Sequence, residues 1–308
     1  MARPTVPPAA ILEPPAALPE RPPAFEGAGR PEEDRRWRGR TVLVTGASRG
    51  IGAALARRWL ARGATVLAHA SRGNPEERTA HLADGLPKES EARDRLFGFV
   101  ADAAVPGELG AAFARLLDDG VEIDAVLFNH GTTTFEADGT TLRVGPPSSF
   151  GAEPMRSLVQ VNALSVWEAL HEIARRWARP EALADNARRR RAIVLEASSG
   201  ALNPNVFDPV PYKVSKAMLL HFVRDLAPEL ARYRVSINAV SPGMIDAGLS
   251  RLPSVEAMRE RILEGIPMAR YGEPEELFEA IDLFLSGRAA FSTGNNLTIN
   301  GGAYVVSS

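Results

Sequence analysis

Four polar residues have types and spacing suited to acid–base chemistry. Tyr212 and Lys216 are four positions apart, so they share one face if that segment is helical. A phenol has a pKa of about 10, and a neighbouring ammonium group lowers it toward the range in which a general acid or base works. Ser199 lies thirteen residues before Tyr212, and its hydroxyl could hydrogen-bond a carbonyl oxygen on which charge develops. Asn162 falls within an expected long helix, where asparagine is unfavourable because its amide competes for backbone hydrogen bonds.

A glycine-rich stretch near residue 50 is suited to binding phosphate. Gly46, Gly50 and Gly52 follow an apolar run at residues 41–44 and precede a segment with helical spacing of apolar residues. Glycine allows a tight turn and a close approach of pyrophosphate to the backbone. The helix that follows directs free N–H groups and its positive dipole end at the phosphates. Strand, glycine turn and helix in this order predict a dinucleotide site.

Together, the two patterns resemble the short-chain dehydrogenase/reductase family over about residues 40–303. Three residues separate Gly46 from Gly50, a longer spacing than in the better-known dinucleotide fingerprint, and Tyr212 and Lys216 follow at a family-like separation. The resemblance implies an NADP(H)-dependent oxidoreductase that transfers hydride between NADPH and a carbonyl group, from ketone to secondary alcohol. The opposite direction, oxidation of the alcohol, is equally allowed.

The same resemblance assigns roles to the four polar residues. Tyr212 is the proton donor, and Lys216 favours its phenolate and bonds the nicotinamide ribose. Ser199 polarises the carbonyl oxygen, for which the neighbouring Ser198 is the weaker candidate. Asn162 holds a water that continues the proton path from Lys216 to solvent. A strand-end serine that caps a turn is the alternative reading of Ser199.

The choice between NADP and NAD depends on the residues after the expected second strand. In similar enzymes an acid there bonds the ribose hydroxyls of NAD and repels the extra phosphate of NADP. Here Ala70, Ser71 and Arg72 occupy the position, and none of them is acidic. Arg49 in the glycine stretch adds a second positive charge, so we expect NADP(H). Arg72 could instead be an ordinary exposed loop arginine.

Loops after the other strands supply the remaining cofactor contacts that the resemblance implies. The full set of expected cofactor-binding residues is Gly46, Ser48, Arg49, Gly50, Ile51, Gly52, Ser71, Arg72, Asp102, Ala103, Asn129, Gly131, Tyr212, Lys216, Pro242, Gly243 and Ile245. Asp102 also suits a helix N-cap. His130 stands where similar proteins carry a small residue, and we expect a packing or hydrogen-bonding role for it rather than catalysis.

Apolar strands alternate with helical segments from residue 40 onward. We expect strands at residues 41–44, 64–70, 96–100, 125–128, 192–195, 235–240 and 296–299. Near-continuous apolar strands separated by helices indicate a parallel sheet covered on both faces. The prediction is an α/β fold, a single Rossmann-type doubly wound parallel sheet of about seven strands, with ligands at the carboxyl ends of the strands.

Composition limits the other possibilities. The chain has 308 residues, 45% apolar and 24% charged, with a net charge of −2 and no cysteine. Disulfides, thiolate metal sites and cysteine nucleophiles are therefore excluded, and no metal site or nucleic-acid partner is expected. The Arg188–Arg191 run is read as a solvated loop. No apolar run is long enough for a membrane span and no signal-peptide core is visible, so a cytoplasmic location without membrane contact is expected.

Residues 1–36 differ from the rest of the chain. Nine of the first 31 residues are proline, a composition that predicts an extended or disordered tail. Residues 37–308 are expected to form the catalytic and dinucleotide-binding domain. The tail is either dispensable or an arm that packs on a neighbouring subunit.

The substrate is expected under residues 244–270, an apolar segment with a helical stretch that suits a mobile lid or a helix packing its own apolar face. Val206 and Phe207 could also line the pocket. Similarity to 3-oxoacyl-[acyl-carrier-protein] reductases makes a 3-oxoacyl thioester one candidate among ketones, sugars and steroids. The resemblance also implies a homo-oligomer, a tetramer or dimer. The alternatives are a non-catalytic NADP(H)-binding scaffold or regulatory protein and, less favoured, an epimerase or dehydratase.

Overall fold

The structure is a computed structural model that describes residues 34–84, 92–139, 141–203 and 208–303. The expected N-terminal tail lies outside these residues except for its last three positions. Trp37, the first residue of the expected domain, is buried against Trp59, with 5.9 Å between ring centroids. The division between tail and domain stays a prediction. Val206 and Phe207, the further candidates for the pocket lining, also lie outside the described residues.

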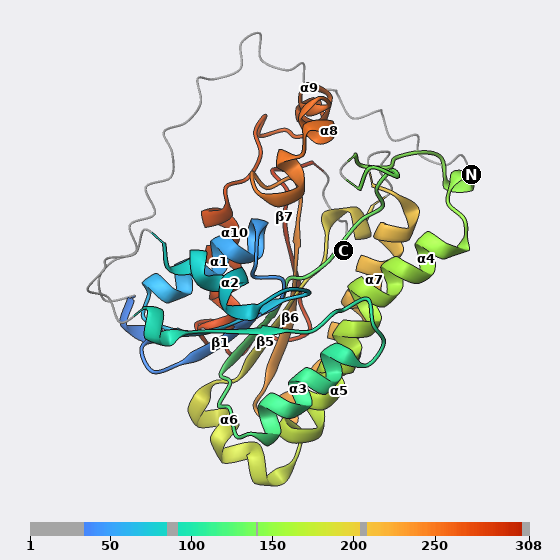
Figure 1. The fold of residues 1–308 in the computed structure, drawn as a ribbon. Coiled ribbons are helices and arrows are strands. Elements are labelled where there is room, and N and C mark those ends of the chain that lie inside the picture. Colours follow the sequence, from blue (N-terminus) through green and yellow to red (C-terminus); the bar gives the residue numbers. More distant parts are fainter. Residues whose placement is uncertain (1–33, 85–91, 140, 204–207, 304–308) are drawn as a thin grey trace, which may run out of the picture.

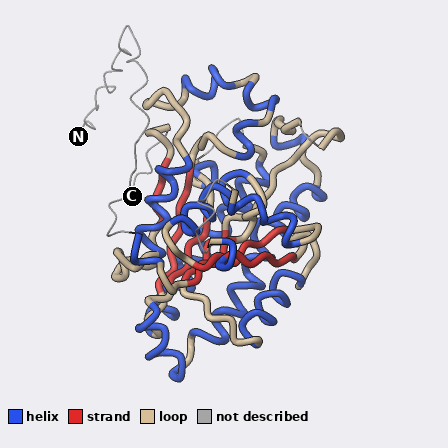
Figure 2. Tube along the Cα trace, turned by 60° about the vertical axis from the view of Figure 1, so that its left-hand side comes forward, coloured by secondary structure: helices blue, strands red, loops and turns tan. Residues whose placement is uncertain are grey.

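The core is a seven-stranded sheet in which every pair of neighbours is parallel, in the order β3-β2-β1-β4-β5-β6-β7 (Figures 1 and 2). The strands are β1 Thr41–Val44, β2 Thr65–Ala70, β3 Leu96–Val100, β4 Ala125–Phe128, β5 Ala192–Glu196, β6 Ser236–Pro242 and β7 Asn296–Ile299. The predicted doubly wound parallel sheet is confirmed. The chain order reverses between β1 and β4, and sheets of this kind bind ligands in the crevice at such a point.

Helices cover both faces of the sheet, as expected for parallel strands joined by crossover connections. They are α1 Gly50–Ala61, α2 Pro75–Thr79, α3 Glu108–Asp118, α4 Ala152–Val159, α5 Ser165–Trp177, α6 Leu183–Arg189, α7 Val210–Arg232, α8 Pro253–Glu256, α9 Arg259–Glu264 and α10 Pro274–Leu285. Figure 1 shows α3, α5 and α7 side by side on one face, with α1 and α10 on the other.

Two apolar clusters fill the space between the sheet and these helices. Successive side chains of a strand point to opposite faces, so Ile193 and Leu195 of β5 join the cluster under α3, α5 and α7. Val194, between them, joins the cluster under α1 and α10. Both faces of β5 are therefore buried, which explains its continuous apolar sequence.

The run Arg188–Arg191 begins in the last turn of α6 and is only partly the solvated loop that the sequence predicted. Arg188 and Arg190 are exposed, but the prediction is wrong for Arg189 and Arg191. The side chains of Arg189 and Arg191 are only 9% and 11% exposed. Both pair with Asp185 of the same helix, at 3.2 and 2.7 Å, and Arg189 also reaches Asp124 at 3.1 Å. The prediction was wrong because these acids lie up to 65 residues away in the sequence or on another turn of the helix.

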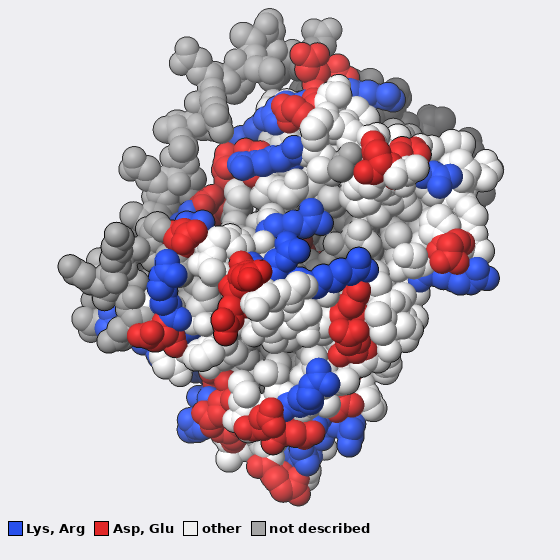
Figure 3. Space-filling model, in the orientation of Figure 1, with Lys and Arg blue, Asp and Glu red and all other residues white. Residues whose placement is uncertain are grey.

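Basic and acidic side chains are interspersed on the face drawn in Figure 3, so no field of one sign dominates it. Within the described part of the chain, no helix combines the length and the apolar composition needed to cross a membrane.

Candidate active site

Tyr212 and Lys216 lie one turn apart near the start of α7, as the sequence predicted for a shared helix face. Lys216 is 3% exposed, and its ammonium donates a hydrogen bond of 2.7 Å to the backbone carbonyl of Glu196 at the end of β5. Burial lowers the pKa of Lys216, and the nearby charge of Glu196 opposes that change. The side chain thus reaches from the helix layer to the carboxyl end of the sheet.

Asn162 lies in a π turn, Gln160–Leu164, that separates α4 from α5 where the sequence predicted one continuous helix. Its side-chain oxygen accepts the N–H of Thr132 at 2.8 Å. Its amide nitrogen donates to the carbonyl of Thr132 and to Ser215 Oγ, each at 2.9 Å. These partners remove the competition that makes asparagine unfavourable in a helix, and π turns of this kind often occur at functional sites.

Ser199 begins a short 3-10 turn, Ser199–Ala201, three residues after Glu196, and is 6% exposed. The neighbouring Ser198 caps this turn, with its hydroxyl accepting the N–H of Gly200 at 3.1 Å. A capping role occupies Ser198 and leaves Ser199 as the better candidate for a substrate contact.

Gly131 marks the point where two of the four predicted residues converge. A Cβ atom added at Gly131 would lie 3.2 Å from Lys216 Nζ and 3.3 Å from Asn162 Oδ1. A larger residue here would therefore press on both side chains. The structure thus brings together Lys216 from α7, Asn162 from the π turn and the strand end that leads to Ser199.

The glycine loop between β1 and α1 is built by close backbone contacts. A Cβ at Gly52 would lie 2.3 Å from the carbonyl oxygen of Gly46, and Gly46 itself has a φ of +67°. Arg49 is the N-cap of α1, but its side chain makes no capping hydrogen bond to the described residues, and the first turn of the helix carries no acidic residue. The first turn of this helix therefore supplies no anion of its own to balance the positive end, which fits a bound pyrophosphate.

His69 positions this loop, and the sequence analysis missed it. Its Nδ1 accepts the N–H of Gly46 at 3.1 Å, so its Nε2 carries the proton and donates to the carbonyl of Ala101 at 2.8 Å. Burial is the main cause that lowers the pKa of His69. The only signal in the sequence was a histidine within the apolar strand at 65–70.

His130 is fully enclosed and hydrogen-bonded, as predicted for a non-catalytic residue. Its two ring nitrogens contact Thr45 Oγ1 at 2.8 Å and Ser165 Oγ at 2.9 Å. It therefore ties the end of β1 to the start of α5, next to the π turn of Asn162. Burial, followed by the charges of His69 and Lys216, lowers its pKa well below the ordinary value.

Asn129 fits a cofactor contact. Its side-chain nitrogen donates to the carbonyls of Thr45 and Gly46 at 3.1 and 3.4 Å. Its side-chain oxygen is buried and has no hydrogen-bond partner among the described residues. A buried acceptor without a donor is costly, so a ligand hydroxyl or amide at this point would satisfy it.

At the other end of the predicted cofactor site, Arg72 and Asp102 form an ion pair of 2.8 Å between Nε and a carboxylate oxygen. The side chain of Arg72 is 77% exposed, and Ser71 and Arg49 are also exposed. Asp102 in addition accepts the N–H of Ala104 at 3.0 Å, a turn that holds the buried Ala103 in place. Arg49, Ser71 and Arg72 are thus exposed here, with Nε of Arg72 already engaged by Asp102.

The loop after β6 presents backbone rather than side chains. Gly243 N–H donates to the carbonyl of Ile299 at 2.8 Å, and a Cβ at Gly243 would lie 2.8 Å from the Cβ of Asn300. Ile245 is 3% exposed, and its side chain packs against Gly272. Any contact of Ile245 with a cofactor would therefore come from its backbone.

The segment at residues 244–270 forms a small apolar cluster of its own, separate from the two that cover the sheet. Its buried members are Val255, Ile262 and Ile266, joined by Tyr271 directly after the segment. Leu142, from the loop after β4, packs on this cluster, and its N–H donates to Ser254 Oγ at 3.2 Å. The glycine loop meets the same segment, since a Cβ at Gly50 would lie 3.0 Å from the Cα of Gly248.

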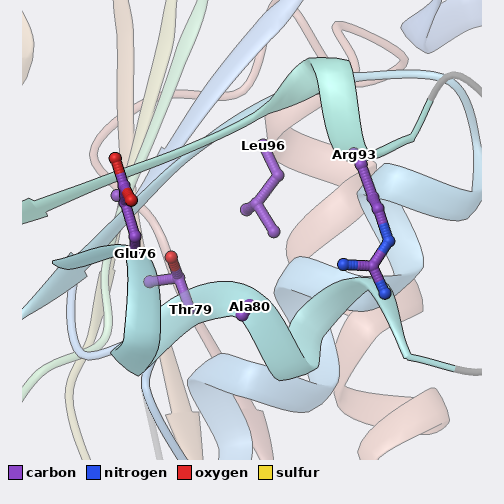
Figure 4. A pocket seen from close by; sticks show the side chains of 6 residues that line it. Glu76, Thr79, Ala80, Arg93 and Leu96 are labelled. Carbon is purple, nitrogen blue, oxygen red and sulfur yellow. The ribbon is translucent and has the colours of Figure 1, made fainter.

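A surface hollow lies elsewhere, beside the edge strand β3. Figure 4 shows its lining, which comprises Glu76, Thr79, Ala80, Arg93, Leu96 and Gly98. None of these residues belongs to the predicted site. Among the described residues, no group of three or more histidines and acids is placed to hold a metal ion.

Comparison with known proteins decides the family. The family model described as enoyl-(acyl carrier protein) reductase matches residues 46–304, a span that runs from the glycine loop past β7. The chain belongs to the short-chain dehydrogenase/reductase family. It is therefore a member of an oxidoreductase family whose enzymes act on carbonyl and alcohol groups.

Individual relatives agree with this membership. The 3-oxoacyl-[acyl-carrier-protein] reductase FabG of Escherichia coli is 28% identical over 270 residues, which are 88% of this chain and 99% of the relative. A short-chain dehydrogenase from Burkholderia cenocepacia in complex with NADP is 26% identical, with a TM-score of 0.70 over 87% of this chain and 99% of that one. A 3-oxoacyl-[acyl-carrier protein] reductase from Brucella melitensis with bound NAD is 25% identical, with a TM-score of 0.69 over 89% and 95%. This short-chain dehydrogenase/reductase thus has solved relatives with either nucleotide.

Proposed function

We propose that this protein is an NADP(H)-dependent carbonyl reductase that interconverts a ketone and a secondary alcohol. The observation that carries the proposal is that the side chains of Lys216 and Asn162 converge around Gly131. Lys216 also binds the backbone carbonyl of Glu196, and Ser199 begins the turn three residues after Glu196. A buried lysine on the same helix face as a tyrosine is what a tuned phenol requires.

The residues of the chain have separate tasks in this reaction. Ser199 donates a hydrogen bond to the substrate oxygen and stabilises the charge that develops there. Tyr212 gives its phenolic proton to that oxygen, and the ammonium of Lys216 stabilises the phenolate left behind. Asn162 holds a water through which the proton is replaced from solvent. When bound, NADPH supplies the hydride that the carbonyl carbon receives.

The cofactor would lie along the carboxyl ends of β1, β2 and β4. The glycine loop and the N-terminus of α1 would hold the pyrophosphate, and the unpartnered oxygen of Asn129 would accept a cofactor hydrogen bond. Arg49, Ser71 and Arg72 favour NADP(H), because their donors and positive charges complement a 2′-phosphate. The relatives that bind NADP and NAD leave this choice to experiment.

The substrate proposed is a small carbonyl compound, with a 3-oxoacyl thioester first to be tested because the E. coli relative is named for reducing one. The apolar cluster of residues 244–270 would cover it. We further propose a homo-oligomer, dimer or tetramer, that associates through an apolar surface on α5 and α7. Trp167 of α5 and Val214 of α7 lie there, each 42% exposed, next to Leu164 at the end of the π turn, which is 40% exposed.

The testing experiment follows the consumption of NADPH with an acetoacetyl thioester beside a panel of ketones and sugars, and with NADH as the control cofactor. Turnover of the thioester with NADPH supports the whole proposal. Turnover of another ketone keeps the mechanism and discards the thioester. Tight NADPH binding without turnover of any compound favours the second candidate, a non-catalytic NADP(H)-binding scaffold.

A further inference from the structure

Glu196 is a buried carboxyl group for which the proposed reaction has no task. It is the last residue of β5 and only 7% exposed. Strand alternation places its side chain on the same face as Val194, the face covered by α1 and α10, beside its register partner Val240 of β6. An acid at the end of an otherwise apolar strand is unusual, because burial of a charge is costly.

One oxygen of this carboxyl group lacks a hydrogen-bond donor in the described part of the chain. Its Oε2 atom is buried and has no hydrogen-bond partner among the described residues. Buried carboxyl groups in folded proteins are normally paired or hydrogen-bonded. Groups whose pKa is shifted by burial and by a specific charge cluster at functional sites, which makes this carboxyl group a candidate for a role there.

The charged group close to Glu196 is Lys216 of α7, which lies on the other face of the sheet. Its ammonium donates a hydrogen bond of 2.7 Å to the backbone carbonyl of Glu196, and its charge acts on the carboxyl group from there. Burial raises the pKa of Glu196 to about 7, and the positive charge of Lys216 works against this rise. His130, whose pKa is lowered partly by the charge of Lys216, is neutral because its pKa lies well below the ordinary value. On the face that Glu196 shares with Val194, Val240 of β6 and the buried residues of α1 carry no charge, and the one acid among the buried residues of α10 is Asp282.

We propose that Glu196 is a positioning residue that keeps the buried ammonium of Lys216 protonated above neutral pH. This inference rests on the proposed function, in which Lys216 supports the proton transfer by Tyr212. Lys216 is itself enclosed, so its charged form needs a compensating negative charge. The ionised carboxylate of Glu196 supplies that charge across the carboxyl end of β5.

The sign of the effect depends on pH. Above about pH 7 the carboxyl group of Glu196 is ionised and favours the ammonium form of Lys216. Below about pH 7 it is neutral and adds nothing, and the low pH alone keeps Lys216 protonated. Removing the carboxylate should therefore matter only on the alkaline side.

The first experiment needs no turnover. Infrared difference spectra of the full chain without cofactor, recorded from pH 5 to 9, should show a protonated carboxyl group that titrates near neutrality and is missing in Glu196→Gln. In Lys216→Met the midpoint of this titration should move to higher pH, because the opposing positive charge is gone. A midpoint that stays in place in Lys216→Met would overturn the proposal, even if the protein reduced a carbonyl.

The second experiment measures kcat/KM for carbonyl reduction against pH in the wild type and in Glu196→Gln. We expect equal values below pH 7 and, above it, an alkaline limb shifted to lower pH by about one unit in the variant. Glu196→Asp, which keeps the carboxylate, should restore part of the limb. A loss of equal size at every pH would show a merely structural role and overturn the proposal.

A matched control is Asp282→Asn. Asp282 of α10 is also buried, and burial raises its pKa, but it is held by the indole N–H groups of Trp37 and Trp59 at 2.7 and 3.1 Å. The pH profile of this variant should have the wild-type alkaline limb. If no carbonyl reduction is found, the infrared titration still decides whether the charge of Lys216 shifts the pKa of Glu196.

Discussion

Asn162 and Ser215 are joined by a hydrogen bond of 2.9 Å that links the π turn to α7 at the residue directly before Lys216. The hydroxyl of Ser215 in turn donates a hydrogen bond of 2.8 Å to the backbone carbonyl of Tyr212. Two predicted catalytic segments, 50 residues apart in the chain, are thus held in register by one serine.

Replacing this serine tests the link. In Ser215→Ala the amide of Asn162 loses one partner, which is worth about 1 kcal/mol, so we expect kcat to fall about fivefold with the affinity for NADPH nearly unchanged. Stopped-flow turnover and fluorescence titration measure the two quantities. Ser157→Ala, at an exposed position of α4, is the control. Wild-type kcat in Ser215→Ala would show that Asn162 does not depend on this bond.

Removing the phenol of Tyr212 tests the proton donor. Tyr212→Phe should lower kcat by a factor of about 10² to 10⁴ and leave NADPH binding intact, because general acid catalysis contributes on that scale. Tyr233→Phe makes the same chemical change at the far end of α7 and should have little effect. Unchanged turnover in Tyr212→Phe would contradict the proposed mechanism. Unchanged cellular function of the same variant would support the alternative, a non-catalytic scaffold protein.

The cofactor preference is tested at Arg72. We expect Arg72→Ala to raise the dissociation constant of NADPH about tenfold and that of NADH much less, because a charge-assisted hydrogen bond to the 2′-phosphate is lost. Arg93→Ala, beside the hollow of Figure 4, controls for the loss of a surface charge at the same edge of the sheet. Equal weakening of both nucleotides would contradict the NADP(H) assignment.

The two buried histidines predict how stability depends on pH. The pKa values of His69 and His130 are lowered in the fold, so the unfolded chain binds protons that the folded chain does not. Their contribution to the free energy of unfolding is present above about pH 6.5 and is lost as the pH falls below it. Glu196 acts with the opposite sign, because its raised pKa costs stability as the pH rises toward 7.

The measurement is urea unfolding of the wild type and of His130→Asn between pH 5 and 8. The variant should be less stable throughout, because it loses the contacts with Thr45 and Ser165, but its stability should fall less between pH 6.5 and 5. Parallel curves would mean that His130 does not change its protonation on unfolding.

Association is tested at Trp167 of α5, whose ring lies 5.3 Å from that of Phe222 on α7. A carboxylate in the middle of this apolar surface should break the contact between subunits, because it cannot be buried unpaired. We expect Trp167→Glu to reduce the molar mass measured by light scattering by at least a factor of two. Phe97→Glu alters another exposed aromatic residue, 53% exposed on β3, and should leave the mass unchanged. A wild-type protein that is already monomeric would refute the proposed oligomer.

The sequence by itself determined the positions of the strands and the class of the fold. The runs at 41–44, 96–100, 125–128 and 296–299 coincide with β1, β3, β4 and β7. For the central strands β1 and β4 the physical reason is that a strand buried on both faces is almost entirely apolar. The glycine loop was also readable, since Gly46 and Gly50 have positive φ angles and a Cβ at Gly52 would collide with the carbonyl of Gly46, six residues earlier.

Only the tertiary structure decided which polar groups are buried together. The role of His69 depends on Ala101, 32 residues later, and Lys216 meets Glu196 only because α7 folds back over the end of β5. The π turn around Asn162 likewise depends on Thr132 and Ser215. Local patterns fix where apolar segments begin and end, whereas the charge state and partners of a buried polar group are set by neighbours that are distant in the sequence.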